Sequence, residues 1–392
     1  MCSNPEQRPS LVNIHCIDFN NTYFTRCPAR VYLFSVLILM KNFLFNNLLL
    51  AILIVLIFII ELLLPHDFFT FRVWEALSVK SIANKFFYGE FYPNKMIERD
   101  EVGDLAHHTK YKKIKHVVWK TDKLGYRNSN FINNPDVLLI GDSFVLGTAL
   151  SQENTLGEHL KELMGLRVYS INGSIYQFYR LYGDHIIEKP KVIIWESLEY
   201  LIPRLEKKEL NYSMSPLLRM IKLNPFFNYC FEIADRIYKQ NMFHFIASRI
   251  MQKKGLGQQS PIADSVFFFG IDKAFIPDDD DIIKKVVDNI SYYNDQLKEM
   301  NIKLIFMPMP NKETVYYNLV PLESEPRFLY KLDSALREAG VSTINVLKLY
   351  RDSSCKDQYL YHLDDAHWNE TGIKIAAVKL SEQLKQEIVN CR

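Results

Sequence analysis

The sequence predicts a doubly wound α/β fold, in which helices cover both faces of a mainly parallel sheet, preceded by one transmembrane helix. Short apolar runs suited to buried parallel strands alternate with amphipathic helical segments from about residue 136 to the last helix. An unbroken apolar run spans residues 48–60, and extended back to Phe43 it reaches about the 20 residues that a bilayer requires. Together these observations predict a three-layer sandwich of the flavodoxin-like kind behind a membrane anchor.

The individual strands and helices follow from the hydrophobic pattern and from the residues that interrupt it. The first five are a strand at 137–140, a helix at 154–164, a strand at 167–171, a helix at about 176–188 and a strand at 192–195. Asn154 caps the first helix and Gly165 ends it, whereas Pro190 stops the second. The pattern resumes with a helix at about 281–299, a strand at 303–307, a helix at about 326–338, a strand at 343–346 and a last helix from about residue 370.

These assignments divide the chain into four segments. They are an N-terminal extension at 1–42, an anchor at 43–64, a polar and aromatic juxtamembrane arm at 65–130, and an α/β domain at 131–392. Prolines and a Gly/Gln-rich stretch interrupt the rhythm at about 201–280, which predicts an insertion or lid with helical pieces. A chain that started at Met40 would begin with an ordinary signal anchor, so residues 1–39 are either an upstream extension or the product of a mis-set start.

The anchor sets the expected location of the domain. A lone N-terminal anchor usually exports the domain behind it, which places that domain on the periplasmic or extracellular side, although the flanking Lys and Arg residues give little orientation signal. Glu61 would cost about 2.5–3.5 kcal/mol at the bilayer centre, but it lies near one end of the run. A cleaved signal peptide is disfavoured because the run is long and no small-x-small site comes after it. A buried core helix is the remaining alternative.

Composition excludes several other classes of function. The 392 residues are 48% hydrophobic with a net charge of +2, which supplies a sizeable core and gives no basic patch for nucleic acid. Six scattered cysteines form no CxxC pair, so a metal cluster is not expected. We predict neither a metal nor a bound cofactor, and no nucleic-acid partner.

Two short motifs carry the chemistry. Ser143 ends a Gly-Asp-Ser turn directly after the first strand, where a hydroxyl is presented at the carboxyl edge of a parallel sheet and a helix start favours negative charge. Far downstream, His367 is a candidate base, with Asp364 and Asp365 as alternative carboxylates to orient its ring. Nucleophile, base and acid are the set that acyl transfer requires. The plain alternative is a capped turn and a surface histidine.

With these residues in place, the sequence resembles the SGNH (GDSL-type) hydrolases, and within them the membrane-associated proteins of alginate O-acetylation, over residues of about 90–385. Gly-Asp-Ser matches the nucleophile block, and Asp-x-His-Trp ending at Trp368 matches the acid–base block, which favours Asp365 over Asp364. The resemblance implies Ser143 as nucleophile, His367 as base, and the backbone N–H groups of Ser143 and Gly173 as the oxyanion hole. It also implies substrate contacts for Lys312 and Trp368.

One block of the superfamily is missing from the sequence. Trp195-Glu196-Ser197 stands where a Gly-x-Asn-Asp block is expected, so one oxyanion donor is unassigned. Loss of one such donor typically costs about 100- to 1000-fold in rate. The acid–base motif comes after the serine, as in ordinary SGNH enzymes, whereas in the alginate proteins it precedes it, and this departure weakens a prediction of alginate itself.

Three hypotheses of function result. The first is a membrane-anchored O-acyltransferase, expected to transfer acetyl groups onto an extracytoplasmic polysaccharide, with a multispanning membrane acyltransferase as donor partner. The second is an esterase or lipase-type hydrolase of the same mechanism that acts on a glycan or another acyl ester. The third is a catalytically silent glycan-binding or assembly protein with the same fold.

Overall fold

The computed structural model describes residues 28–208, 214–250, 257–270, 276–322, 324–352 and 358–390. The chain divides into one unit that ends at Ile59 and a second that starts at Ile60. Most of helix α1 (Pro28–Leu63) makes up the described part of the first unit. Its stretch Val36–Leu63 has a mean hydropathy of 2.9 and is long and apolar enough to cross a membrane. The helix begins before the predicted anchor, because residues 28–42 are themselves mostly apolar.

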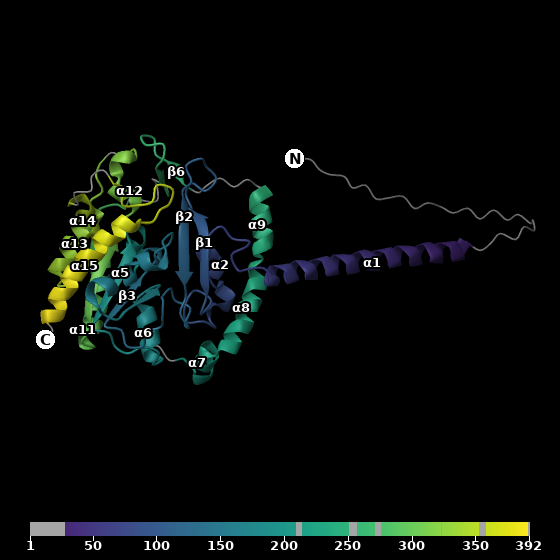
Figure 1. Ribbon diagram of the computed structural model, residues 1–392, viewed down its shortest axis with the longest axis horizontal. Coiled ribbons are helices and arrows are strands. Elements are labelled where there is room, and N and C mark those ends of the chain that lie inside the picture. Colours follow the sequence, from purple (N-terminus) through teal and green to yellow (C-terminus); the bar gives the residue numbers. More distant parts are fainter. Residues whose placement is uncertain are drawn as a thin grey trace, which may run out of the picture. The chain divides into compact units, whose positions relative to one another are not determined.

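A five-stranded parallel sheet forms the centre of the second unit (Figure 1). Its strands are β3 (Val137–Gly141), β4 (Val168–Asn172), β5 (Val192–Leu198), β8 (Lys303–Met309) and β9 (Ser342–Thr343). Their order is β4-β3-β5-β8-β9, and every neighbouring pair is parallel. The chain reverses its direction across the sheet between β3 and β5, which is where ligands bind in doubly wound folds.

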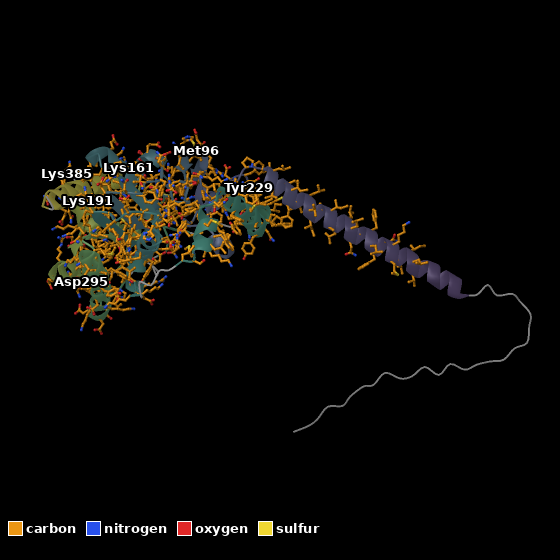
Figure 2. All side chains as sticks on the ribbon, turned by 90° about the horizontal axis from the view of Figure 1, so that it is seen from below. Met96, Lys161, Lys191, Tyr229, Asp295 and Lys385 are labelled. Carbon is orange, nitrogen blue, oxygen red and sulfur yellow. The ribbon has the colours of Figure 1, made fainter. Side chains whose placement is uncertain are left out.

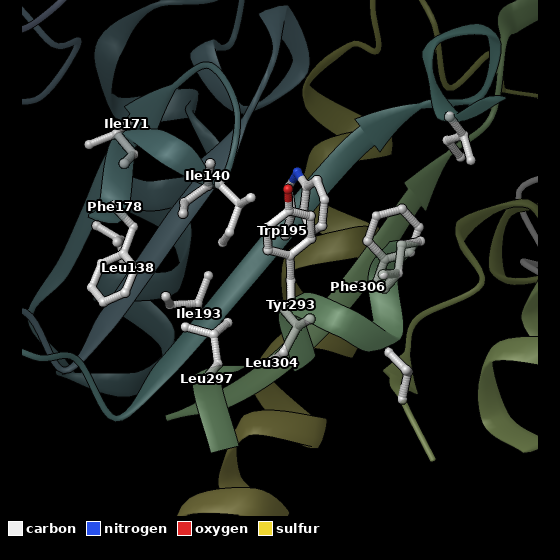
Figure 3. Packing of buried hydrophobic residues seen from close by; sticks show 14 of the residues in the cluster. Leu138, Ile140, Ile171, Phe178, Ile193, Trp195, Tyr293, Leu297, Leu304 and Phe306 are labelled. Carbon is white, nitrogen blue, oxygen red and sulfur yellow. The ribbon is translucent and has the colours of Figure 1, made fainter. Parts of the chain in front are cut away.

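Helices cover both faces of this sheet because successive strand residues point to opposite sides. One face packs on α6 (Tyr176–Gly183), α11 (Asp280–Glu299) and α13 (Phe328–Glu338), with Leu138, Ile140, Ile193 and Trp195 pointing to it. Figure 3 shows Trp195 between the strands and Tyr293 of α11. The other face packs on α5 (Leu156–Met164), α14 (Val346–Asp352) and α15 (Glu370–Asn390). The predicted doubly wound fold is therefore confirmed.

Three boundaries differ from the prediction for local reasons. Thr155, not Asn154, caps α5, because its hydroxyl accepts a hydrogen bond from Glu158 N. Helix α6 ends at Gly183, well before Pro190. Strand β9 has only two residues, and Val346 starts α14 instead of ending a strand.

The predicted juxtamembrane arm is a folded part of the second unit. Residues 65–130 contain α2 (Val73–Leu77), α3 (Ser81–Asn84) and an antiparallel pair of strands, β1 (Met96–Val102) and β2 (Ile114–Lys120). Leu77, Phe87, Tyr92 and Trp119 form a separate core there. The strands escaped prediction because they are rich in charged residues and bury only part of one face.

The segment at 201–280 contains helical pieces, as expected of the predicted insertion. They are η2 (Glu199–Arg204), α7 (Pro216–Leu223), α8 (Pro225–Lys239) and α9 (Asn241–Ile250), followed by the short antiparallel strands β6 (Gln258–Gln259) and β7 (Phe267–Phe268). Four more short helices lie in the described part of this unit: α4 (Ser143–Leu146), η1 (Gln152–Asn154), α12 (Lys312–Val315) and η3 (Tyr317–Leu319).

Candidate active site

The turn between β3 and α4 presents Ser143 at the carboxyl end of the sheet. Asp142 caps α4, since its Oδ1 accepts a hydrogen bond from Phe144 N at 3.0 Å, and Gly147 ends the helix in the left-handed region with φ of 72°. Gly141 cannot carry a side chain here, because a Cβ would lie 2.2 Å from Glu196 Oε2. The Gly-Asp-Ser sequence thus fits the close approach of β5 to this turn.

A hydrogen-bonded chain links Ser143 to His367 and Asp365. His367 Nε2 lies 2.8 Å from Ser143 Oγ, and His367 Nδ1 lies 2.5 Å from Asp365 Oδ1. Asp365 Oδ1 also accepts from His367 N at 3.1 Å, which fixes the short loop before α15. A proton on Nδ1 satisfies the carboxylate and leaves Nε2 to accept the serine proton. This is the arrangement of a nucleophile, a base and an acid that orients the base.

Asp364 takes a different direction from its neighbour. Its Oδ1 lies 2.7 Å from Lys115 Nζ, and its Oδ2 accepts hydrogen bonds from Gly103 N and Lys113 N. The structure therefore brings Asp365, and not Asp364, to His367. Asp364 instead fastens the loop to the β1–β2 hairpin. Of the two carboxylates left open by the sequence, only Asp365 has the geometry to orient the imidazole.

Three charged residues of the first hundred or so positions complete this network and were missed in the sequence. Arg72 Nη1 donates to Asp365 Oδ2 at 2.9 Å, with Glu101 and Asp104 carboxylates at 3.7 and 3.9 Å from its guanidinium. Arg72 is 3% exposed, so this is a buried ion pair. No local signal reveals it, because Arg72 and Asp365 are 293 residues apart.

The charges around His367 set its protonation. Burial opposes its charged form, but the Asp365 carboxylate and Asp104 outweigh burial and raise the pKa of His367 above its ordinary value. Burial would raise the pKa of Asp365, yet Arg72 and His367 hold that pKa well below the usual range. Burial and the neighbouring Asp365 raise the pKa of Asp104. Asp365, the acid of the hydrogen-bonded chain, is thus ionised at neutral pH and stabilises the imidazolium form of His367.

A cavity of about 630 Å³ opens in front of Ser143. Its walls are formed by Asp104, Ser143, Phe144, Leu198, Tyr200, Arg204, Phe269, Gly270, Asn311, Lys312, Glu313, Ala366 and His367. This volume is within the range of small-molecule sites. The two reacting groups thus face a space in which an acyl donor or acceptor fits.

Lys312 lines the cavity but uses its ammonium for the protein itself. Its Nζ donates to the carbonyl oxygens of Phe267, His362, Leu363 and Asp365 at 2.6 to 3.1 Å. An ammonium has three donors, so these four acceptors satisfy it fully. Burial lowers its pKa to about 8. Lys312 therefore holds the loop that carries Asp365 and His367, and its substrate contact stays a prediction.

Two other expectations need correction. Gly173 N donates to Gly141 O at 2.7 Å, so its N–H joins the carboxyl ends of β3 and β4. Gly173 does not line the cavity. Trp368 is fully buried against Phe144 and does not line the cavity either, so it packs the core behind the base. Of the predicted oxyanion donors, Ser143 alone borders the cavity.

A pair of buried carboxyl groups lies beneath the nucleophile turn. Glu196, which stands where the missing block was expected, accepts from Asp142 N at 2.9 Å, while Asp142 Oδ2 accepts from Leu198 N at 3.1 Å. Burial and the neighbouring Asp142 raise the pKa of Glu196 well above its ordinary range. Burial also raises the pKa of Asp142. Glu196 therefore supports the turn through its hydrogen bond from Asp142 N, at the position where an amide residue was expected.

Among the described residues, Asp104, Asp365 and His367 have ligand atoms within 4.8 Å of one another, close enough for a metal ion. Both oxygens of Asp365 are already engaged, one with His367 and the other with Arg72. The guanidinium of Arg72 also brings a positive charge to the same place, which opposes a cation. The donor set does not fit a resident metal.

The parallel sheet and its flanking helices form an SGNH-like fold, and the Ser–His–Asp geometry supplies the groups that acyl transfer or ester hydrolysis requires. Residues 268–391 match the family model described as the SGNH hydrolase-like domain of the acetyltransferase AlgX. The matched segment includes Asp365 and His367 but not Ser143. This match confirms the resemblance predicted from the sequence.

The other comparisons add no argument to this match. No curated protein matches the chain significantly. A solved structure of a proposed acylhydrolase from Bacteroides fragilis is 11% identical, covers 65% of this chain and 87% of that chain, and has a TM-score of 0.33. A second solved structure is 15% identical, covers 65% of this chain and 97% of that chain, and has a TM-score of 0.32. At these TM-scores neither structure carries an argument about the site.

Proposed function

We propose that the protein is a membrane-anchored O-acyltransferase that moves an acyl group, an acetyl group in our proposal, onto a hydroxyl of an extracytoplasmic polysaccharide. The observation that carries the proposal is the hydrogen-bonded chain from Ser143 through His367 to Asp365 at the cavity. The family match supports the acetyltransferase class. Helix α1, long and apolar enough to span a membrane, supports the anchoring.

The proposed reaction proceeds through an acyl-enzyme. His367 Nε2 takes the proton of Ser143 as Oγ attacks the acyl carbonyl, and it then gives that proton to the departing group of the donor. A sugar hydroxyl next enters, loses its proton to His367 and attacks the acyl-enzyme, which restores the serine. Asp365 stabilises the imidazolium in both halves. The Ser143 N–H, at the start of α4, is the proposed oxyanion donor.

A donor partner follows from the proposed anchoring. A domain held at a membrane surface is suited to receive acyl groups from a multispanning membrane acyltransferase, which would carry them across the bilayer. Asp104, Tyr200 and Arg204 in the cavity wall offer polar groups that can hydrogen-bond a hydroxylated acceptor. We therefore propose a glycan as the acceptor.

An esterase with the same residues is the second candidate, favoured by the hydrolase-like description of the matched family. Water would then replace the sugar hydroxyl in the second half-reaction. The engagement of Gly173 N elsewhere favours the third candidate, a silent glycan-binding protein, because it leaves Ser143 as the single assigned oxyanion donor.

One experiment separates these three. The full chain in detergent is given p-nitrophenyl acetate with and without an oligosaccharide acceptor, and acetylated sugar is separated from free acetate. The acyltransferase predicts acetylated sugar, the esterase predicts acetate alone, and the binding protein predicts neither. Replacement of Ser143 by Ala removes turnover in the first two cases, and unchanged turnover would exclude Ser143 from the reaction.

A further inference from the structure

Helix α8 has its polar face turned inward and its apolar face turned outward. Its four buried residues are all polar or charged, namely Asn228, Glu232, Asp235 and Lys239. Their spacing of four, three and four residues places them on one side of the helix. Phe226 on the opposite side is 67% exposed, and Tyr229 on the flank is 60% exposed. This is the reverse of the pattern of a surface helix in a water-soluble domain.

The buried polar residues explain why the helix takes this orientation. Asp235 accepts from Tyr92 Oη at 2.7 Å and from Lys80 N, and Lys239 Nζ donates to Ala76 O at 3.2 Å. These bonds pair Asp235 and Lys239 inside the protein, so the orientation is built into the fold. Phe226 and Tyr229 are left exposed as a consequence.

The two neighbouring helices extend the same face. Helix α7 exposes Leu217 and Met220 while its one buried residue is Lys222, whose Nζ donates to Phe87 O at 3.0 Å. Helix α9 has no buried residue, and Phe243 and Ile250 are among its exposed apolar side chains. We call the surface formed by Leu217, Met220, Phe226, Tyr229, Phe243 and Ile250 the outer face. Large exposed apolar side chains on three successive helices indicate an interaction surface.

The hydrogen bonds that α8 and α9 make with the end of α1 indicate what covers the outer face. Arg236 donates to the carbonyl oxygens of Glu61, Leu62 and Leu64, and Met242 N donates to Glu61 Oε2 at 2.9 Å. The stretch able to cross a membrane ends at Leu63. Within the unit that starts at Ile60, α8 and α9 are therefore hydrogen-bonded to the last residues of that stretch and to Leu64.

Aromatic and basic side chains around the outer face fit the boundary between lipid headgroups and acyl chains. Tyr229, labelled in Figure 2, and Trp74 are partly exposed aromatic residues with polar tips, a type enriched at membrane interfaces. Arg249 is exposed on α9, next to Ile250. A helix with aromatic and aliphatic residues outward and cations at its margin lies in the interface plane.

We propose that the outer face of α7–α9 lies in the headgroup and acyl-chain boundary of the membrane, so that the folded unit rests on the lipid surface. The proposal rests on the proposed membrane anchoring and deepens it: α1 supplies the tether, and α7–α9 supply a second, peripheral contact. Two contacts fix the unit's orientation, whereas a single tether lets it rotate freely.

The test is photocrosslinking of the full chain in vesicles of three parts phosphatidylcholine to one part phosphatidylglycerol. Benzoylphenylalanine replaces Phe226 or Tyr229 on the outer face, and Tyr359 or Leu163, also exposed but on other elements, as matched controls. Phe45 in α1 reports the tether. The expected result is a phospholipid adduct at Phe226 and Tyr229, at least about tenfold above both controls, as for residues seated in the interface.

The outcomes separate the two parts of the proposal. Lipid adducts at Phe45 without adducts at Phe226 and Tyr229 would overturn the peripheral contact and leave the tether standing. Absence of lipid adducts at Phe45 would overturn the tether. The same variants in cell membranes distinguish the occupant, since a protein adduct in place of the lipid adduct at Phe226 would show that a membrane protein covers the face.

Discussion

Replacement of Arg72 by Gln tests how this residue, which lies before β1, affects stability and the pKa of the proposed base, His367. At an effective dielectric constant of about 20, unit charges at the 2.9 Å between Arg72 Nη1 and Asp365 Oδ2 attract by roughly 6 kcal/mol. Much of this attraction offsets the desolvation of the two buried charges. Removal of one partner from a buried pair costs about 3–5 kcal/mol, so we expect a loss of stability of that order.

The pH dependence carries the sharper expectation. Arg72 acts against the charged form of His367, so its removal raises the pKa of His367. The base must be neutral to take the Ser143 proton, and the acid limb of kcat/KM reports its pKa in the free enzyme. The acid limb of the kcat/KM profile therefore moves to higher pH in Arg72→Gln. The loss of activity of this variant, relative to the unmodified protein, is largest at low pH.

The assay is the pH profile of kcat/KM on p-nitrophenyl acetate between pH 5 and 9, with circular dichroism to show that each variant is folded. Arg72→Lys keeps the charge and should leave the limb within about half a unit. Glu101→Gln removes a carboxylate 3.7 Å from Arg72 and should move the limb, if at all, to lower pH. A folded Arg72→Gln protein whose limb stays in place or moves downward would refute the reasoning.

Four other substitutions have distinct expected outcomes. Asp365→Asn should lower kcat by about 10⁴-fold, as loss of the orienting acid does in other triads. Asp364→Asn should mainly lower stability. Equal losses of kcat in the two variants would contradict the assignment of Asp365 as the orienting acid. Lys312→Met should cost about 1–3 kcal/mol in urea unfolding, because it leaves buried carbonyl oxygens without donors, and a neutral result would contradict its structural role. Gly141→Ala should cost at least about 3 kcal/mol or prevent folding, since its Cβ meets Glu196 at 2.2 Å. Because the pKa of Glu196 is raised in the folded state, that state keeps a proton that the unfolded state releases above about pH 4.3, and the free energy of unfolding falls as pH rises. Glu196→Gln should remove this fall. An unchanged pH slope of stability in Glu196→Gln would argue against the raised pKa.

How far the sequence predicts this protein depends on the distance between the interacting residues. Ser143 and the Asp365–His367 pair each lie in a short motif, with the strand or helix beside it, so local pattern sufficed to name them. The central sheet was predictable for the same reason, because β3 and β5 are almost purely apolar. Arg72 was not, because its partner is 293 residues away.

Lys312 and Gly173 differ from their expected roles for another reason. Their residue types permit the predicted chemistry, yet in the fold the Lys312 ammonium donates to four carbonyl oxygens and the Gly173 N–H donates to Gly141 O. Which partner a donor finds depends on tertiary packing, which a single sequence does not display.

The acyl-enzyme is the central claim, and peptide mass spectrometry tests it most directly. The full chain is mixed with p-nitrophenyl acetate, quenched in acid within the first turnovers and digested, and the acetylated residue is identified. We predict an acetyl group on Ser143 that is lost when an acceptor is added before the quench, and no such adduct in His367→Ala. Acetylation at another residue while Ser143 stays unmodified, with turnover proceeding, would contradict the account.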